Sequence, residues 1–378
     1  MKALACEMAI IGAGYCGLSA AIELAGRGFG VRVFERGEWA GNASAFNFGS
    51  VAAMPPALPN RDAQGSQGAD AQQRLRAVLE PISELKRQID TFEYDCQWRQ
   101  PGHITLAMDD DAARTLKQRH AEASTLFGGG VHWLDARQVS AQTAAQGVVA
   151  GLLNEHFALI DPAGLLLAMR NHAQALGVRI DYSSPVLALD PQADSVNLQL
   201  PAARVNAARV LIASEEAWGL CTEAALQPLT MFQTHLCESQ VLGARDLQLI
   251  SRRARVYGTA TADKDYFRVH HGRLLFGSRL GLVPLDASPQ AVVAALQARL
   301  AGYFPSLAAI PVARVWSGSL GFTDNGLPRL GASGPVSWGG GYCGSGIATA
   351  VQCGRQLARM ATEAGVTTGS QPMQSSQR

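Results

Sequence analysis

Met8-Ala-Ile-Ile-Gly-Ala-Gly-Tyr-Cys-Gly17 is an apolar run followed by three glycines at G-x-G-x-x-G spacing. The apolar run predicts a buried parallel strand, and the Ala- and Leu-rich stretch from Leu18 to Arg27 predicts a helix. Residues 31–35, Val-Arg-Val-Phe-Glu, predict a second strand that ends in a carboxylate. Strand, helix and strand in this order predict a βαβ unit.

Each glycine has its own physical task in such a unit. Gly12 permits the tight turn, Gly14 lets a pyrophosphate approach the backbone, and Gly17 lets the helix pack closely on the strand. The helix N-terminus offers free N–H groups to the phosphate, and Glu35 is an acceptor for the ribose hydroxyls. We therefore predict a dinucleotide site; the alternative is a glycine-rich turn without a ligand. The candidate residues here are Gly12, Ala13, Gly14, Tyr15, Cys16, Gly17, Glu35 and Arg36.

Composition excludes several other classes of protein. A chain of 378 residues with net charge +1 suggests two to three domains, without the charge that nucleic acid or an anionic membrane would attract. Its seven cysteines include no C-x-x-C pair, so we expect neither a metal site nor a disulfide framework. We expect no signal peptide, no membrane-spanning helix and a cytoplasmic location, because no apolar segment of the required length occurs.

The loop after Glu35 is small, polar and broken by glycines. It follows the ribose-binding strand directly, so we expect it to lie over the nucleotide; a plain surface loop is the alternative. Its candidate cofactor-binding residues are Ala43, Ser44, Asn47, Phe48 and Gly49. Residues 55–70 are rich in Pro, Gly and polar side chains, which predicts a mobile connector or a lid.

The middle of the chain alternates between helical and strand patterns. Helices are predicted over 71–90, 110–127, 162–176 and 289–302, and strands over 103–107, 178–182, 210–213 and 312–316, with short strands between 186 and 211. Asp161 is the expected N-cap of the third of these helices. Residues 265–277 predict a hairpin with His271-Gly272 at its turn, in which Tyr266 and Arg268 share one face.

A second glycine-rich loop, residues 339–346, follows a short strand and precedes an Ala-rich helix. Its helix N-terminus could point its positive end at another electron-rich part of the same cofactor, such as the N1–C2=O edge of a flavin. The alternative is a helix that merely begins with glycines. Its candidate residues are Gly341, Tyr342, Gly344, Ser345, Gly346 and Ile347, and Val186 is a further cofactor candidate. Residues 365–378 predict a disordered tail.

Taken in order, these segments resemble the D-amino acid oxidase superfamily of FAD-dependent oxidoreductases, with glycine oxidase, sarcosine oxidase and γ-glutamylputrescine oxidase. The resemblance rests on residues 10–21, 34–36, 42–49, 102–107, 161–164, 266–277, 316–318, 327–328 and 341–347. It implies an α/β (α+β overall) fold with a Rossmann-like FAD-binding domain and a mixed-sheet substrate domain. The implied FAD-binding domain comprises residues 1–90, 155–220 and 322–364, and the substrate domain residues 91–154 and 221–321.

The resemblance implies removal of a hydride from a carbon that bears an amine, giving an imine that hydrolyses. Electrons then pass to oxygen or another acceptor. Tyr266 and Arg268 are the candidate catalytic, substrate-contacting residues; ordinary sheet residues are the alternative. A flavin subunit that passes electrons to a partner subunit, and a flavin-binding protein without turnover, are the other functions considered.

Several positions depart from the family pattern. Members that bind an α-carboxylate commonly have Arg four residues after the Trp of Trp-x-Gly, where this chain has Leu320. Arg268 or Arg279 could replace it, because only a fork of donors is needed. Phe46 stands where Arg is frequent, and Ala213-Ser-Glu-Glu216 replaces the usual glycine after a strand. The loop at 45–49 has no His, so we expect non-covalent FAD, with Cys343 as the residue that could alter this. These departures suggest an unusual substrate or partial loss of activity.

Overall fold

The computed structural model describes residues 2–39, 41, 43–52, 69–220, 228–261, 263–279, 287–363 and 371–372. The predicted connector at 55–70 lies outside the described residues except for its last two positions. Of the predicted tail, only Gln371 and Pro372 are described, and they form the short strand β19.

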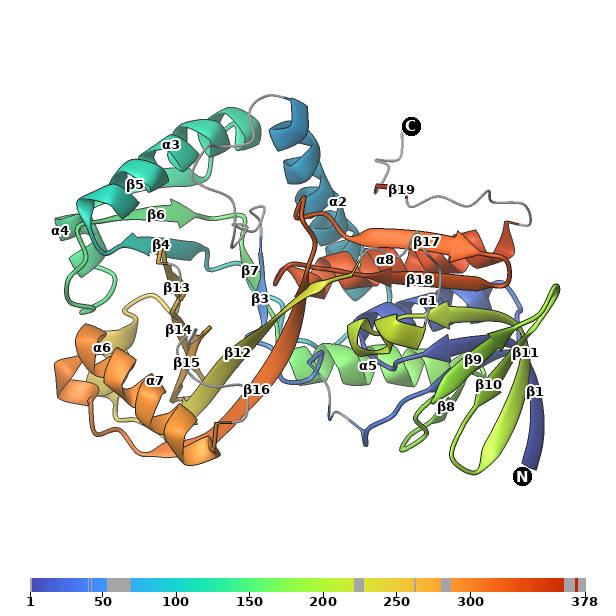
Figure 1. The fold of residues 1–378 in the computed structure, drawn as a ribbon. Coiled ribbons are helices and arrows are strands. Elements are labelled where there is room, and N and C mark those ends of the chain that lie inside the picture. The colour runs from blue at the N-terminus through green and yellow to red at the C-terminus, as the bar shows by residue number, and fades with distance from the viewer. Residues whose placement is uncertain are drawn as a thin grey trace.

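The chain forms two mixed β-sheets with helices packed on them, a mixed α/β architecture (Figure 1). In the first sheet the predicted βαβ unit is present: β1 (Lys2–Ile11), α1 (Tyr15–Gly26) and β2 (Val31–Phe34). β1 and β2 are parallel, and Ile11 lies opposite Phe34. Gly12 and Glu35 therefore leave the same edge of the sheet, which brings the glycine turn and the carboxylate together.

Nine strands make up this sheet, in the order β19-β17-β18-β11-β1-β2-β8, with β10 and β9 attached to β11. The additional strands are β8 (Arg179–Asp181), β9 (Ala188–Pro191), β10 (Val196–Gln199), β11 (Ala203–Ile212), β17 (Arg329–Ser333) and β18 (Val336–Gly340). The predicted short strand at 210–213 is the end of the ten-residue β11, which lies between β1 and β18.

Helices cover one face of the nine-stranded sheet. They are α1, α2 (Ala69–Thr91), α5 (Pro162–Ala175) and α8 (Gly346–Thr362). α1 and α8 approach closely at Gly354, where an added Cβ would lie 2.1 Å from the Cys16 carbonyl oxygen. The other face packs Phe34, Trp218 and Trp338 against β10, and the 3₁₀ turn η1 (Glu215–Leu220) lies on this side.

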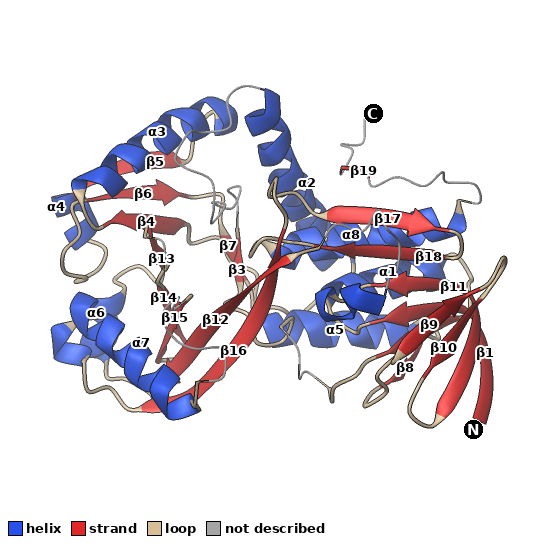
Figure 2. Ribbon diagram, viewed as in Figure 1, coloured by secondary structure: helices blue, strands red, loops and turns tan. Residues whose placement is uncertain are grey.

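The second sheet has eight strands in the order β16-β12-β15-β14-β13-β4-β6-β5. These are β4 (His103–Ala107), β5 (Val131–Asp135), β6 (Ala150–Asn154), β12 (Thr230–Ser239), β13 (Val256–Thr259), β14 (Tyr266–His270), β15 (Arg273–Ser278) and β16 (Val312–Phe322). β14 and β15 are the predicted hairpin, and β16 extends six residues beyond the predicted strand. β12 and β16 are the long strands that reach toward the nine-stranded sheet (Figure 2).

The core of the eight-stranded sheet lies on the side covered by α6 (Ala244–Ile250) and α7 (Pro289–Tyr303). Phe267, Tyr257 and Phe276 are buried there, and the rings of Phe267 and Tyr257 are stacked with centroids 4.9 Å apart. Side chains alternate along a strand, so Tyr266 and Arg268 point to the opposite face. α3 (Asp110–Phe127) covers part of that face near β4, β5 and β6, and the short α4 (Ala136–Ser140) follows β5.

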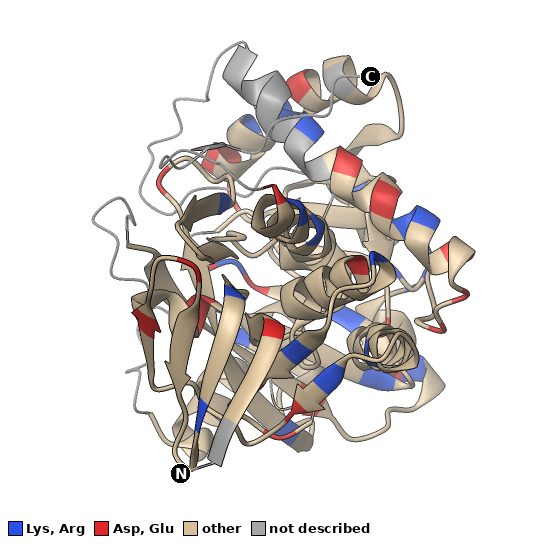
Figure 3. Ribbon diagram, turned by 90° about the vertical axis from the view of Figure 1, so that its right-hand side faces the viewer, with Lys and Arg blue, Asp and Glu red and all other residues tan. Residues whose placement is uncertain are grey.

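On the elements seen in Figure 3, Lys and Arg are mixed with Asp and Glu. In the part of the chain that the structure describes, no helix is long and apolar enough to cross a membrane. Within the same residues no three His, Cys, Asp or Glu side chains are grouped as metal ligands. The six described cysteines are not disulfide-bonded, and Cys221 lies outside the described residues.

Candidate active site

The G-x-G-x-x-G turn has the geometry that the sequence predicts. Gly12 has φ +104°, and a Cβ there would lie 3.0 Å from Cβ of Ser214. A Cβ at Gly17 would lie 1.8 Å from the carbonyl oxygen of Gly12, so a side chain there would force the turn open. The turn therefore holds its backbone closer to α1 than any residue but glycine allows.

Backbone donors at the start of α1 are available to an anion. Gly14 is the N-cap and has no side chain to cap the helix, while Tyr15 N donates to Ser44 Oγ at 3.1 Å. The N–H groups of Cys16 and Gly17 belong to the first helical turn, which has no intrahelical acceptors. No acceptor for them occurs among the described residues. This arrangement fits the pyrophosphate of a dinucleotide.

Glu35 lies beside this turn and is buried. Its Oε2 accepts from Ala13 N at 2.8 Å, and its Oε1 accepts from Gly37 N at 2.9 Å. A carboxylate has further lone pairs, so Glu35 can still accept from a ribose hydroxyl. Arg36 points outward and pairs with Glu216. Val186 follows Ser184, whose N–H donates to Glu35 O, and it packs against the apolar cluster that contains Phe34.

The loop at 43–49 is held by its own side chains. Asn47 donates from Nδ2 to the Ser44 and Ala43 carbonyl oxygens at 2.9 and 3.2 Å. Its Oδ1 accepts from Gly49 N at 2.8 Å. Asn47 thus fixes the loop that presents Ser44 to α1. β3 (Ser50–Val51) then pairs with β7 (Ala158–Leu159) and ends the loop.

The same loop contacts the eight-stranded sheet. Trp316 Nε1 donates to the Phe46 carbonyl at 2.7 Å, and the rings of Phe48 and Tyr266 meet edge to face with centroids 4.8 Å apart. A Cβ at Gly49, whose φ is +76°, would lie 2.9 Å from Arg268 Nη2. The loop therefore lies between the predicted cofactor cradle and the two predicted catalytic residues, and brings them into one site.

Tyr266 is fixed from two sides. Its hydroxyl lies 2.5 Å from Thr234 Oγ1, and its ring lies over Gly277, where a Cβ would come within 2.3 Å of it. Burial raises the pKa of Tyr266 to about 12, so the phenol is protonated at neutral pH. It can therefore donate a hydrogen bond or accept one, but carries no charge.

Arg268 is only 1% exposed. Among the described residues no carboxylate forms an ion pair with its guanidinium, and its buried Nε has no hydrogen-bond partner. The Phe48 ring makes a cation–π contact with it, with the ring centroid 5.4 Å from Cζ. Burial and the nearby Arg99 lower the pKa of Arg268 to about 10, which leaves it cationic at neutral pH. A buried cation without a counter-ion is costly and indicates an anionic ligand.

The second glycine-rich loop is held by Glu215. This partly buried carboxylate accepts from Gly321 N at 2.7 Å, Gly341 N at 2.8 Å and Tyr342 N at 3.2 Å. Burial raises the pKa of Glu215. Two predicted cofactor residues, Gly341 and Tyr342, thus have their N–H groups already bonded within the protein.

The donors that remain in this loop lie at the start of α8. Gly344 has φ +79°, and Ser345 is an N-cap without a side-chain cap bond. Gly346 and Ile347 begin the helix, and their N–H groups are therefore available to a ligand. Cys343 is buried, and its Sγ lies 3.5 Å from Thr323 Oγ1.

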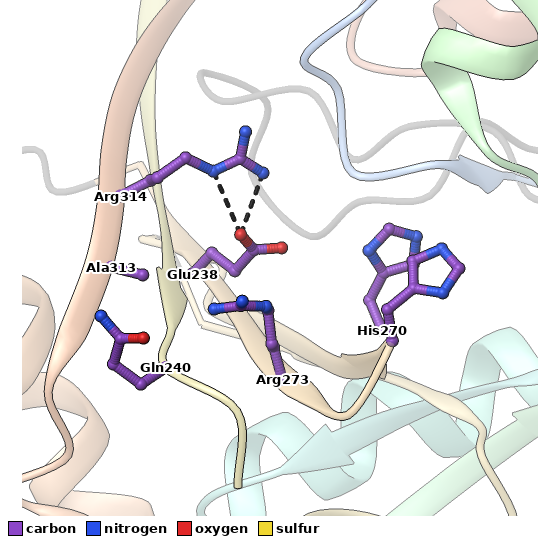
Figure 4. A pocket seen from close by; sticks show the side chains of 7 residues that line it. Glu238, Gln240, His270, Arg273, Ala313 and Arg314 are labelled. Carbon is purple, nitrogen blue, oxygen red and sulfur yellow. Dashed lines mark hydrogen bonds and ion pairs between the residues drawn. The ribbon is translucent and has the colours of Figure 1, made fainter.

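A pocket of about 480 Å³ lies farther along the face that carries Tyr266 and Arg268 (Figure 4). It is lined by Glu238, Gln240, His270, His271, Arg273, Ala313 and Arg314. His270 follows Arg268 on the same face of β14, and Glu238 and Arg314 lie opposite each other on β12 and β16. The pocket therefore continues the candidate site outward.

Sequence reasoning missed Thr234, Glu238 and Arg314 as site residues, and it noted Glu215 only as a departure from the family pattern. Each becomes relevant through a partner distant in sequence, such as Glu215 with Gly341 or Thr234 with Tyr266. Strand alternation places Thr234 and Glu238 on one face of β12, but no sequence signal indicates which strand lies beside it.

Comparison with known proteins agrees with this geometry. The family described as FAD dependent oxidoreductase (DAO) matches residues 7–360. Gamma-glutamylputrescine oxidoreductase of Escherichia coli (strain K12) is 25% identical over 95% of this chain and 84% of that protein. Glycine oxidase of Bacillus licheniformis is 23% identical over 93% of this chain and 91% of that protein. The crystal structure of glycine oxidase from Geobacillus kaustophilus superposes with TM-score 0.79 at 19% identity, covering 97% of both chains.

Proposed function

The chain belongs to the DAO family of FAD-dependent oxidoreductases, and from that premise we propose that it oxidises the C–N bond of an amine that also carries a carboxylate. The observation that supports the carboxylate is Arg268, a guanidinium 1% exposed and without an anionic partner among the described residues. Leu320 cannot bind an anion, so Arg268 takes the role of the family's arginine on another strand.

FAD fits the residues that are present. Gly12, Gly14 and Gly17 leave room for the pyrophosphate, and Glu35 and Ser44 offer polar contacts along the nucleotide. The start of α8, from Gly344 to Ile347, supplies a second set of open N–H groups. When bound, FAD supplies the two-electron acceptor for the hydride that leaves the substrate carbon.

The chain's own residues bind and orient the substrate in this scheme. Arg268 holds the carboxylate, and Tyr266, fixed by Thr234, limits the positions that the amine can take. Phe48, whose ring contacts Tyr266 edge to face, borders this position on one side. The substrate loses a hydride from carbon and a proton from nitrogen, and water hydrolyses the resulting imine. No side chain has to act as a strong base for this reaction.

The names of the two relatives support the substrate class. Glycine and γ-glutamylputrescine are chemically different, yet each contains an amine and a carboxylate. We therefore propose amino acids and carboxylate-bearing amines as the compounds to test, with oxygen or another acceptor receiving the electrons.

The test is the visible absorption spectrum of the FAD-loaded protein under anaerobic conditions, with amines that do and do not carry a carboxylate. We expect bleaching only with the carboxylate-bearing compounds. Arg268→Gln should raise the apparent Kd for them roughly a hundredfold, because a buried charge pair is lost. Arg204→Gln, at an exposed position on β11, is the matched control and should leave the Kd unchanged.

Bleaching by carboxylate-free amines with equal affinity, or an unaffected Arg268→Gln variant, would overturn the role of Arg268. Admitting air after bleaching separates an oxidase from a dehydrogenase that uses a partner subunit. A flavin that no compound bleaches would instead favour a flavin-binding protein without turnover.

Three further expectations remain predictions: a cytoplasmic location, non-covalent FAD, and the division into an FAD-binding part (1–90, 155–220 and 322–364) and a substrate-binding part (91–154 and 221–321). The membership of the two sheets supports the last of these, because β1, β2, β8–β11, β17 and β18 fall in the first part.

A further inference from the structure

We propose that the pocket around Glu238 is a second binding subsite, which takes an ammonium group of the substrate in addition to the amine that is oxidised. This inference rests on the proposed function. It narrows the substrate class to amines whose far end is an amino-acid head group, with the carboxylate at Arg268 and the ammonium at Glu238.

The Glu238 carboxylate has one oxygen bonded and one oxygen open. Arg314 donates to Oε2 from both Nε, at 3.1 Å, and Nη2, at 2.9 Å. Oε1 points away from Arg314 toward His270 (Figure 4). No hydrogen-bond donor to Oε1 occurs within the described ranges. The side chain is only 10% exposed, and it lines the pocket.

Among the described residues, none of the groups that line the pocket forms a hydrogen bond or ion pair with Oε1, although Arg273 and Arg314 are both cations of this pocket. Burial, together with Arg268 and His271, lowers the pKa of His270 to about 4, so its imidazole is neutral at neutral pH. Arg273 donates from Nη1 to the Ser239 carbonyl at 2.9 Å, which turns one arm of its guanidinium to the backbone. A ligand ammonium with three donors is a group that suits a buried carboxylate oxygen without a donor.

Glu238 and Arg268 lie in one row across the sheet, because Leu275 of β15 is opposite Arg268 on β14 and opposite Glu238 on β12. The charge of Glu238 favours the cationic form of Arg268, and His270 lies one row further along the same face, next to Arg268 on β14. A buried carboxylate and a buried guanidinium with free bonding capacity match the two charges of an α-amino-acid head group. Tyr266 lies on the other side of Arg268, where the far end of such a molecule would place its reacting amine.

The experiment uses three pairs of compounds that differ only by the α-ammonium group: L-lysine and 6-aminohexanoate, L-ornithine and 5-aminopentanoate, and γ-L-glutamylputrescine and N-glutarylputrescine. The apparent Kd of each is taken from the concentration dependence of anaerobic flavin bleaching in the FAD-loaded protein. In at least one pair the ammonium-bearing member should bind about tenfold tighter or better.

Glu238→Gln should abolish that difference and leave the Kd of the ammonium-free member unchanged. Arg314→Gln keeps the carboxylate and should keep the difference, which separates ammonium binding from a structural ion pair. Calorimetric titration of the FAD-loaded protein with L-norleucine and hexanoate makes the same comparison for ligands without the terminal amine.

The subsite would be overturned if the two members of every pair had the same apparent Kd, even if bleaching occurs. It would also be overturned if Glu238→Gln weakened the binding of both members of a pair equally. If bleaching occurs only with compounds outside these pairs, the subsite is likewise overturned while the proposed function stands. If no amine bleaches the flavin, the proposed function itself fails, and the subsite fails with it.

Discussion

At the scale of single residues, Lys264 shows how desolvation, together with nearby like charges, affects an ammonium group. Lys264 precedes β14, and Arg279 and Arg119 lie near it. Desolvation of the side chain and these two guanidinium groups lower the pKa of Lys264 to about 8. The folded protein therefore holds this proton less tightly than the unfolded chain does.

The lowered pKa of Lys264 makes the stability of the folded protein depend on pH. Between pH 8 and the normal lysine pKa, the unfolded chain binds more protons, so the stability contributed by this group increases with pH. Lys264→Met should raise the free energy of unfolding at pH 7 by about 1 kcal/mol, a modest value because the side chain retains contact with solvent. Urea unfolding at pH 7 and pH 10 should show this gain shrinking at the higher pH; a constant gain would contradict it.

Residue-level features divide into those that sequence alone predicts and those that it does not. Alternation along the hairpin places Tyr266 and Arg268 on one face, and the structure confirms the strand and its turn. The sequence could not predict that Arg268 forms no ion pair among the described residues, because this depends on which side chains the neighbouring strands place beside it. The open oxygen of Glu238 is likewise a property of the assembled sheet.

At the scale of elements, α1 contains two glycines with opposite roles. Gly17 faces the turn, where a Cβ would lie 1.8 Å from the Gly12 carbonyl oxygen. Gly26 ends the same helix, and an added Cβ there would have no atom within 4 Å. The two positions form a matched pair within one helix.

Gly17→Ala should lower FAD affinity by at least about a hundredfold or prevent FAD uptake, since the turn must open to admit the methyl group. Gly26→Ala should bind FAD normally and gain about 0.5–1 kcal/mol in stability, because alanine loses less backbone entropy on folding. Flavin fluorescence titration and thermal unfolding measure the two effects. Equal FAD affinities would show that the close approach at Gly17 is not needed.

Elements whose ends carry local signals were predictable. Asp161 caps α5 as expected, with Oδ1 accepting from Ala163 N at 3.1 Å, and α3 spans the predicted residues 110–127. The full length of β11 was not predictable from its apolar end, because its first half is a ladder with β10 in which polar and apolar residues alternate. Glu215 could not be placed either, since its three partners come from β16 and the second glycine-rich loop.

At the scale of the whole molecule, the loop at 43–49 connects the two sheets. Ser44 accepts from α1, whereas Phe46, Phe48 and Gly49 contact Trp316, Tyr266 and Arg268 of the other sheet. A ligand that orders this loop should therefore stabilise both sheets. FAD, bound at the cradle, is the ligand that we expect to do so.

Trp316→Phe tests this coupling, because it keeps an aromatic ring beside Phe46 but removes the indole N–H that donates to the Phe46 carbonyl. In the wild-type protein, FAD should slow hydrogen exchange in α1 and β1 and also in β14 and β16. In Trp316→Phe the slowing should persist in α1 and β1 but diminish in β14 and β16, and the increase in Tm on adding FAD should be smaller. FAD should stabilise the Trp316→Phe variant by about 1 kcal/mol less than it stabilises the wild-type protein, which is the contribution of one hydrogen bond. Trp133→Phe, on β5 of the same sheet and away from the loop, should behave as wild type. If FAD slows hydrogen exchange in β14 and β16 equally in all three proteins, then contacts other than this loop transmit the effect of FAD to the eight-stranded sheet.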